Sequence, residues 1–211
     1  MPVRSIRVSV RRAAPLLLLL SAACASTAMV NMWKDPVYPQ HPLMNVLVVT
    51  LRKDPVSRRI WEDGFVSALR ASGVRATASY TLFPTALPDT GALIDSVRAR
   101  GYDAMLIAHL VSASTITQWV PGYVMAQPRW YPGPWRAHYA LYWGALYAPG
   151  YLETDRVVRY ETDMWMTEGA GRLVWSGTTA SINPTSARDV NREIADIIAP
   201  ELLRQRVTAG P

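Results

Sequence analysis

Glu161 and Asp163 are the two carboxylates whose spacing would suit acid–base chemistry. They stand two residues apart in a segment, 156–166, where apolar and charged residues alternate, so both belong to one face of a predicted strand. Paired carboxylates can catalyse hydrolysis when their surroundings separate their two pKa values, but here Arg159 shares their face and no apolar surround is evident. We therefore expect a solvated strand face, and a hydrolase using this pair is kept as an alternative.

The other reactive residue types form no recognisable constellation. His41, His109 and His138 lack the spacing of metal ligands, and His109 lies in an apolar run that predicts a hydrogen-bonded core histidine. The sequence also has no nucleophile elbow, no phosphate-binding loop and no dinucleotide-binding glycine motif. We expect a protein that is not an enzyme and that uses no metal and no cofactor.

The most unusual segment is 119–151, which holds ten of the twenty aromatic residues of the chain, five prolines, and only two full charges, Arg129 and Arg136. Tyrosine and tryptophan combine a large rigid surface with a polar tip, which suits protein interfaces, sugar stacking and membrane interfaces. We interpret the segment as a functional insertion between a strand and a hairpin. The residues that we expect to bind a partner are Trp119, Trp130, Tyr131, Trp135, Tyr139, Trp143 and Tyr147.

Three interpretations of this insertion remain open at the level of sequence. It could bind an envelope protein or another copy of the chain, or it could stack on carbohydrate such as peptidoglycan. It could also fold back and cover a bare sheet face. The polar residues available beside the rings for sugar binding are Gln127, Arg129, Arg136 and His138.

The N-terminus indicates export from the cytoplasm. Arg4, Arg7, Arg11 and Arg12 precede a short apolar run centred on Leu16–Leu20, which is typical of a cleaved secretory signal and short for a retained membrane span. The run ends in Ser-Ala-Ala-Cys, which resembles the lipobox of bacterial lipoproteins, with Ser21 where that family usually has leucine.

The lipobox resemblance implies that residues 1–23 are removed and that Cys24, the single cysteine, is acylated. In that family an aspartate after the cysteine favours retention in the inner membrane, and Ala25 stands there instead. The resemblance therefore implies a lipid-anchored protein on the periplasmic face of the outer membrane.

Loss of the signal also changes the charge. The whole chain carries 22 basic and 16 acidic residues, and removal of the four signal arginines leaves 18 basic residues and a net charge of +2. The high isoelectric point thus derives largely from the signal, and we expect no nucleic-acid binding.

Periodicity predicts the elements that must position these residues. We expect a tether over 24–44 and a single domain over 45–207, with strands at 45–51, 74–80 and 102–111. Helices begin near Asp54 and Asp89 and end near Gly73 and Gly101. A hairpin over 156–181 and a helix that starts at Ser186 follow, with Pro200 expected to kink or end that helix. The order predicts an α/β fold, a βαβαβ layer extended by an antiparallel hairpin.

The segment 45–80, with Trp61, Glu62, Asp63, Phe65, Leu69 and Gly73, resembles a group of uncharacterised bacterial lipoproteins. It is more distantly similar to the amino-terminal domain of TolB and to the curli-export lipoprotein. The stretches YDAMLI and LVWSGT match the uncharacterised group as well. The resemblance implies a fold and no activity, so we expect a non-catalytic envelope scaffold or assembly factor.

Overall fold

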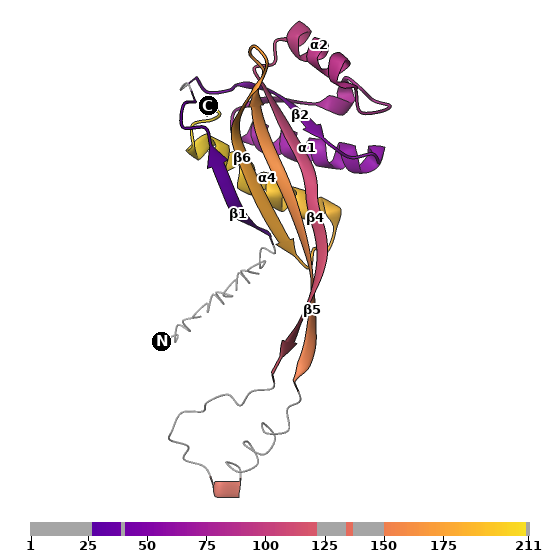
Figure 1. Cartoon of the computed structure of the whole chain (residues 1–211), viewed down its shortest axis with the longest axis vertical. Coiled ribbons are helices and arrows are strands. Elements are labelled where there is room, and N and C mark those ends of the chain that lie inside the picture. Colours follow the sequence, from indigo (N-terminus) through magenta and orange to yellow (C-terminus); the bar gives the residue numbers. More distant parts are fainter. Residues whose placement is uncertain (1–26, 39–40, 122–133, 137–149, 210–211) are drawn as a thin grey trace, which may run out of the picture.

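A six-stranded mixed sheet forms the frame of the molecule. The computed structural model describes residues 27–38, 41–121, 134–136 and 150–209. The strands lie in the order β1 (Thr27–Lys34), β6 (Arg172–Ile182), β5 (Tyr151–Met166), β4 (Ala104–Val120), β2 (Asn45–Thr50) and β3 (Arg75–Ala78) (Figure 1).

The first half of the domain has the predicted parallel βαβαβ arrangement. β2 pairs in parallel with both β3 and β4, and the helices α1 (Pro55–Ala71) and α2 (Thr90–Arg100) make the two crossovers. β2 lies between β3 and β4 and nearly all of its side chains are buried, which explains its run of β-branched and apolar residues. The hairpin β5–β6 adds to this half through the antiparallel pair β4–β5, so the predicted α/β fold is confirmed.

The helix ends follow the local sequence signals. The Asp54 carboxylate accepts a hydrogen bond from the N–H of Ser57 at 2.7 Å and caps α1, and Pro55 occupies the first turn. The bond to the Ser57 amide favours the ionised carboxylate and lowers the pKa of Asp54. Asp89 caps α2 in the same way, and Gly101 ends it in the left-handed conformation.

The last helix, α4 (Ala187–Arg204), contains Pro200 and continues past it, so of the two predicted effects of this proline, a kink or an end, the end is wrong. The helix is held on both sides of the proline by packing, with Ile198 and Leu202 fully buried. α4 also packs closely on α1, where the side-chain amide of Asn191 donates to the carbonyl of Ile60 at 2.8 Å.

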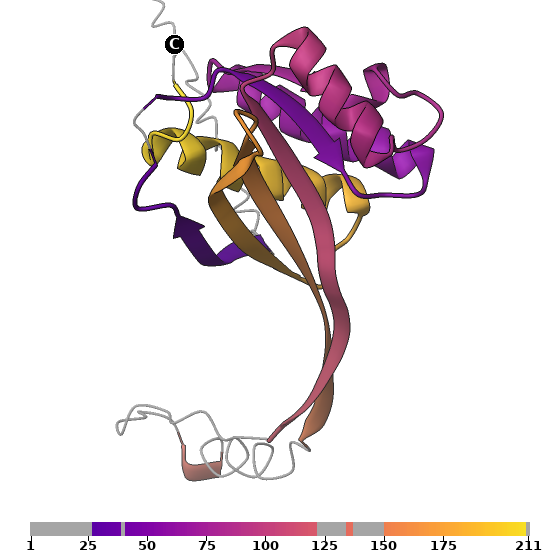
Figure 2. The same ribbon diagram turned by 45° about the horizontal axis from the view of Figure 1, so that its top comes forward.

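The two faces of the sheet are covered unequally. α1 and α4 lie side by side on one face and enclose the main core with Trp61, Phe65 and Trp175 (Figure 2). α2 lies on the opposite face, where Val97 packs on Leu47 of β2. Over β5 and β6 that second face carries half-buried residues, as the alternating burial pattern of both strands shows.

The structure corrects the prediction of a tether over 24–44. Thr27–Lys34 is the edge strand β1, antiparallel to β6, and Thr27 is buried. Only part of β1 meets the core, so its sequence lacks the regular alternation that predicts a strand. Its pairing partner β6 lies about 150 residues later in the chain, so the pairing is not visible in the local sequence. The folded domain therefore includes β1 and does not begin at residue 45.

Candidate functional site

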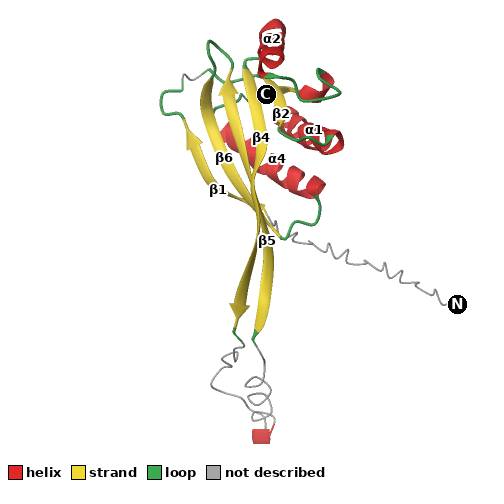
Figure 3. Ribbon diagram, turned by 45° about the vertical axis from the view of Figure 1, so that its right-hand side comes forward, coloured by secondary structure: helices red, strands yellow, loops and turns green. Residues whose placement is uncertain are grey.

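β4 and β5 are the longest strands, and they continue past the rest of the sheet as a two-stranded arm. β6 makes its last pair with β5 between Ile182 and Val157. We define the arm as Thr115–Val120 of β4 and Tyr151–Arg156 of β5, six cross-strand pairs spanning about 20 Å. Figures 1 and 3 show that the arm extends away from the helices and from the other strands of the sheet.

Asn183 sits at the base of the arm, where β6 ends. Its backbone adopts φ 47°, a conformation that asparagine tolerates better than most residues, and Pro184 follows. Its Oδ1 accepts from the N–H of Arg156 at 2.8 Å, and its Nδ2 donates to the Asp155 carboxylate at 2.7 Å. The side chain thus occupies the hydrogen-bonding groups of β5 at the point where β6 no longer pairs with it.

The arm changes from polar to apolar toward its end. In its middle, the hydroxyls of Thr117 and Thr154 lie 3.2 Å apart, and Gln118 donates to Glu153 at 3.3 Å. The next cross-strand pair is apolar.

Trp119 and Leu152 form that apolar pair, with Tyr151 following, and their side chains are 62 %, 66 % and 58 % exposed. The Trp119 ring lies so close to Gly150 that a Cβ added there would be 2.3 Å from Cζ2, so a residue without a side chain is needed. Large apolar side chains this exposed at the end of a narrow ribbon form a surface suited to binding.

The structure places two of the seven predicted partner-binding residues. Trp119 is exposed at the end of the arm, and Trp135 is 73 % exposed with the guanidinium of Arg136 5.6 Å from its ring centre. Five lie outside the described residues: Trp130, Tyr131, Tyr139, Trp143 and Tyr147. Cys24, the predicted lipidation site, also lies outside them.

Glu161 and Asp163 share the more open face of the sheet, as the alternation predicted. Glu161 is the register partner of His109 on β4, and Asp163 that of Ile107. The three polar side chains are partly exposed, so the prediction of a core position for His109 is wrong. One carboxylate oxygen of Asp163 is buried without a hydrogen-bond partner, which is a costly arrangement for an ionised group. Within the described residues, neither carboxylate forms an ion pair or a hydrogen bond with another acidic or basic side chain.

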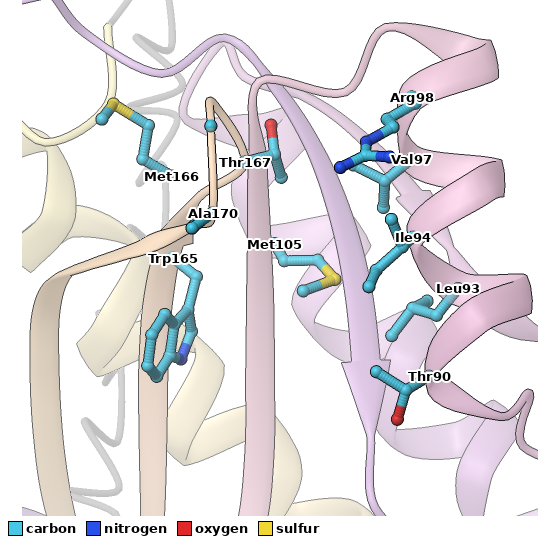
Figure 4. Close-up of a pocket in the computed structure, with 12 residues that line it drawn as sticks. Thr90, Leu93, Ile94, Val97, Arg98, Met105, Trp165, Met166, Thr167 and Ala170 are labelled. Carbon is cyan, nitrogen blue, oxygen red and sulfur yellow. The ribbon is translucent and has the colours of Figure 1, made fainter.

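A pocket lies at the other end of the sheet from the arm, between α2 and the β5–β6 turn. It encloses about 320 Å³ and its walls are mainly apolar, with Ile94 and Val97 of α2 facing Met105 of β4 and Trp165 of β5 (Figure 4). Arg98 is the one charged residue in its lining. The pocket has the size and character to hold a small apolar group, but it lacks paired groups for catalysis.

Sequence reasoning missed a buried polar cluster at the carboxyl ends of β2 and β3. Glu62 accepts from Nε of Arg58 at 3.0 Å and from the hydroxyl of Ser79 at 2.7 Å, and all three side chains are buried. Arg58 also donates to the carbonyls of Phe83 and Ala86 at 2.8 and 2.9 Å. The i, i+4 spacing of Arg58 and Glu62 was the available signal, but such pairs are usually exposed. These hydrogen bonds fix the loop after β3. Because Arg58 and Glu62 are buried and already bonded to protein groups, we assign the cluster a structural role.

Within the described ranges, no group of three or more His, Cys, Asp or Glu side chains is arranged to hold a metal ion. The helices of the same ranges include none with the length and hydropathy needed to cross a membrane.

Neither a protein-family model nor a curated protein sequence matches the chain. Solved structures give weak matches, of which two are dodecamers of PelC from Paraburkholderia phytofirmans. A PelC variant has 13 % identity and a TM-score of 0.46, with 82 % of this chain and 96 % of that chain covered. A second PelC structure has 12 % identity and a TM-score of 0.44, covering 87 % and 99 %.

A PDZ domain protein from Parabacteroides distasonis is similar over 79 % of this chain and 33 % of its own, with 11 % identity and a TM-score of 0.32. At these values the matches assign no function to this chain.

Proposed function

We propose that the protein is a non-catalytic, lipid-anchored periplasmic interaction protein that presents its aromatic insertion to an envelope partner on the end of the β4–β5 arm. The observation that carries the proposal is the exposure of Trp119, Tyr151 and Leu152 together at the end of a ribbon held apart from the core. In the arm, β4 and β5 pair only with each other, so these side chains add little to the core of the domain. A binding role accounts for their presence.

The cell-envelope setting of this proposal rests on the N-terminal sequence. Acylation of Cys24 would fix the protein to a membrane, since two or three acyl chains anchor stably where one gives only marginal binding. In the lipoproteins whose lipobox the N-terminus resembles, a residue other than aspartate after the cysteine favours the outer membrane, and Ala25 stands at that position. The partner is then an envelope protein or a second copy of the chain.

In-cell photo-crosslinking tests the binding role. A photoreactive residue replaces Trp119 or Trp135 in the full chain, and Val56, an exposed apolar residue on α1, receives the same probe as a control. A discrete heavier band from positions 119 and 135 but not from 56 supports the proposal, and its mass separates a partner from a self-dimer. Equal labelling at all three positions, or none with the protein folded and anchored, would remove the insertion as an interface.

Radiolabelled fatty acid and membrane fractionation test the anchor separately. The native chain should incorporate label and sediment with the outer membrane, whereas Cys24→Ala should do neither. Ala25→Asp should keep the label and move the protein to the inner membrane. Label that still enters Cys24→Ala would refute the proposed anchor without touching the crosslinking result.

A further inference from the structure

The first described strand fixes the point at which the chain enters the folded domain. Thr27, the first residue of β1, is buried, and its hydroxyl lies 2.7 Å from that of Ser181 and donates to Glu193 of α4. At the other end of β1, Asp35 forms an ion pair with Arg172 and donates its N–H to the carbonyl of Val174 at 3.0 Å. With both ends of the strand bonded, the entry point cannot slide along the sheet.

Very little chain separates this entry point from the proposed lipid anchor. Only Ala25 and Ser26 lie between Cys24 and Thr27. Three Cα–Cα steps reach at most about 11 Å, so an acylated Cys24 would hold Thr27 within that distance of the membrane surface. The distance is short because Thr27–Lys34 is an edge strand of the sheet and not part of a flexible tether.

The direction of β1 places this entry point at the arm end of the sheet. Thr27 pairs with Ser181, which in turn pairs with Val158 of β5, two residues from the base of the arm. Figures 1 to 3 show the start of β1 at the level where β4 and β5 begin to extend alone. The opposite end of β1, Lys34, is about 24 Å away along the strand, beyond the reach of the two linking residues.

These distances exclude an arm that points away from the anchoring membrane. Such an orientation would turn the Thr27 end of the sheet outward, and Cys24 would have to cross the height of the sheet to reach the lipid. The arm therefore points toward the membrane or lies along it, and its end extends about 20 Å beyond the base at Arg156.

The chemistry of the arm's end suits a bilayer interface. Trp119, Tyr151 and Leu152 are exposed there, and tryptophan and tyrosine favour the headgroup level where an apolar ring and a polar tip are both accommodated. The segment 119–151 contains no acidic residue, and its full charges are the arginines at 129 and 136, which anionic lipid headgroups attract.

We infer that the end of the arm is a second membrane contact, with Trp119, Tyr151 and Leu152 lying in the interface of the same bilayer that holds the lipid. This inference rests on the proposed anchor and narrows the proposed partner: a protein that meets the insertion is embedded in that membrane or lies on its surface. The arm and the acyl chains together fix the orientation of the domain on the membrane.

Depth-dependent fluorescence quenching tests the contact in the full lipidated protein. Acylation consumes the native thiol, so a cysteine introduced by Leu152→Cys is the one site for an environment-sensitive fluorophore. Tyr151→Cys gives a second position, and Glu168→Cys labels the β5–β6 turn at the opposite end of the sheet as the control. Vesicles contain phosphatidylethanolamine and phosphatidylglycerol, with or without a spin-labelled phosphatidylcholine quencher.

The expected result is that spin-labelled lipid quenches at least half of the emission at positions 151 and 152 and leaves position 168 unchanged. Vesicle-bound protein without quenching at 151 and 152 overturns the membrane contact while the anchor stands. Quenching at 168 alone would reverse the orientation and also overturn it. Protein that fails to sediment with vesicles removes the anchor itself, and the contact with it.

Discussion

The side chain of Asn183 accepts a hydrogen bond from the backbone N–H of Arg156 at 2.8 Å, at the point where the arm leaves the sheet. The Asn183 N–H donates in turn to the Arg156 carbonyl at 2.8 Å. The two residues thus exchange bonds as a ladder pair would, one position after β6 has ended. β6 therefore ends here while β5 continues, and Asn183 joins the end of β6 to the base of the arm.

Substitution of Asn183 should loosen the base of the arm. Asn183→Gly keeps the positive φ and the backbone bond to Arg156 but removes the two side-chain bonds to Arg156 and Asp155, which should lower the free energy of unfolding by about 1 kcal/mol. Asn183→Ala adds a backbone cost of about 1 kcal/mol because alanine disfavours φ 47°. Hydrogen exchange of the Arg156 amide should rise in both variants. An unchanged exchange rate in Asn183→Gly would show that the side chain does not hold the arm.

Trp119→Ala should leave the stability of the domain almost unchanged. The ring is 62 % exposed and its strand pairs with β5 alone at that position, so the core loses no contact. We expect a change within about 0.5 kcal/mol in urea unfolding, as is usual for surface positions. Trp61→Ala, in the buried core, should cost about 4 kcal/mol in the same assay. A large loss in Trp119→Ala would mean that the end of the arm packs on the domain.

The buried pair Arg58–Glu62 gives a sharper test of the fold. Arg58→Met leaves the Glu62 carboxylate buried without its cation and should destabilise the domain by about 3 kcal/mol. Arg59→Met is the matched control, since Arg59 is exposed one residue away and contacts the Tyr80 ring at 5.8 Å. Its effect should stay within about 0.5 kcal/mol. Equal effects of the two substitutions would contradict the assigned role of Arg58.

Features that depend on residues close together in the sequence were predicted, and features that depend on residues far apart in the sequence were missed. The caps at Asp54 and Asp89 and the turn at Gly101 are set by residues within one helical turn, so local patterns sufficed. β1 was missed because its strand character depends on β6, far away in the sequence. The Arg58–Glu62 cluster was missed because nothing local separates a buried i, i+4 pair from an exposed one.

The same distinction applies to the candidate site, where the aromatic insertion was predicted and the two-stranded arm was not. An aromatic insertion between the third strand and the hairpin was predicted from composition alone, and two of its residues, Trp119 and Trp135, are exposed. That β4 and β5 form an arm was not predicted, because segment 112–118, polar except for Ala113 and Ile116, carries no strand pattern of its own. Cross-strand pairing with β5 supplies the structure there.

Tyr38 should make stability fall at high pH. Burial and the nearby Asp103 carboxylate raise its pKa to about 12, and its hydroxyl donates to the His41 carbonyl at 2.6 Å. The folded pKa lies above the unfolded value of about 10, so the stabilisation is complete below pH 10 and is lost as the pH rises toward 12. The loss should amount to about 2 kcal/mol. Unfolding of the native chain and of Tyr38→Phe from pH 8 to about 12 measures it, since the variant lacks this dependence.

The double amide variant Glu161→Gln with Asp163→Asn separates a binding role from a hydrolytic one. The two carboxylates repeat on one strand face about 7 Å apart, with a buried, unpartnered oxygen on Asp163 that favours an uncharged side chain. We therefore expect the variant to unfold at the same or a higher urea concentration than the native protein.

Crosslinking from position 119 should also remain unchanged in that variant, because the arm and the carboxylates share no contact. Release of dye from labelled peptidoglycan should not differ between the native protein and the variant. A release that occurs with the native protein and disappears with the amides, in a chain that still folds and crosslinks, would assign catalysis to this face of the sheet. His109→Gln would then be the next substitution, since His109 is the register partner of Glu161 on the neighbouring strand β4.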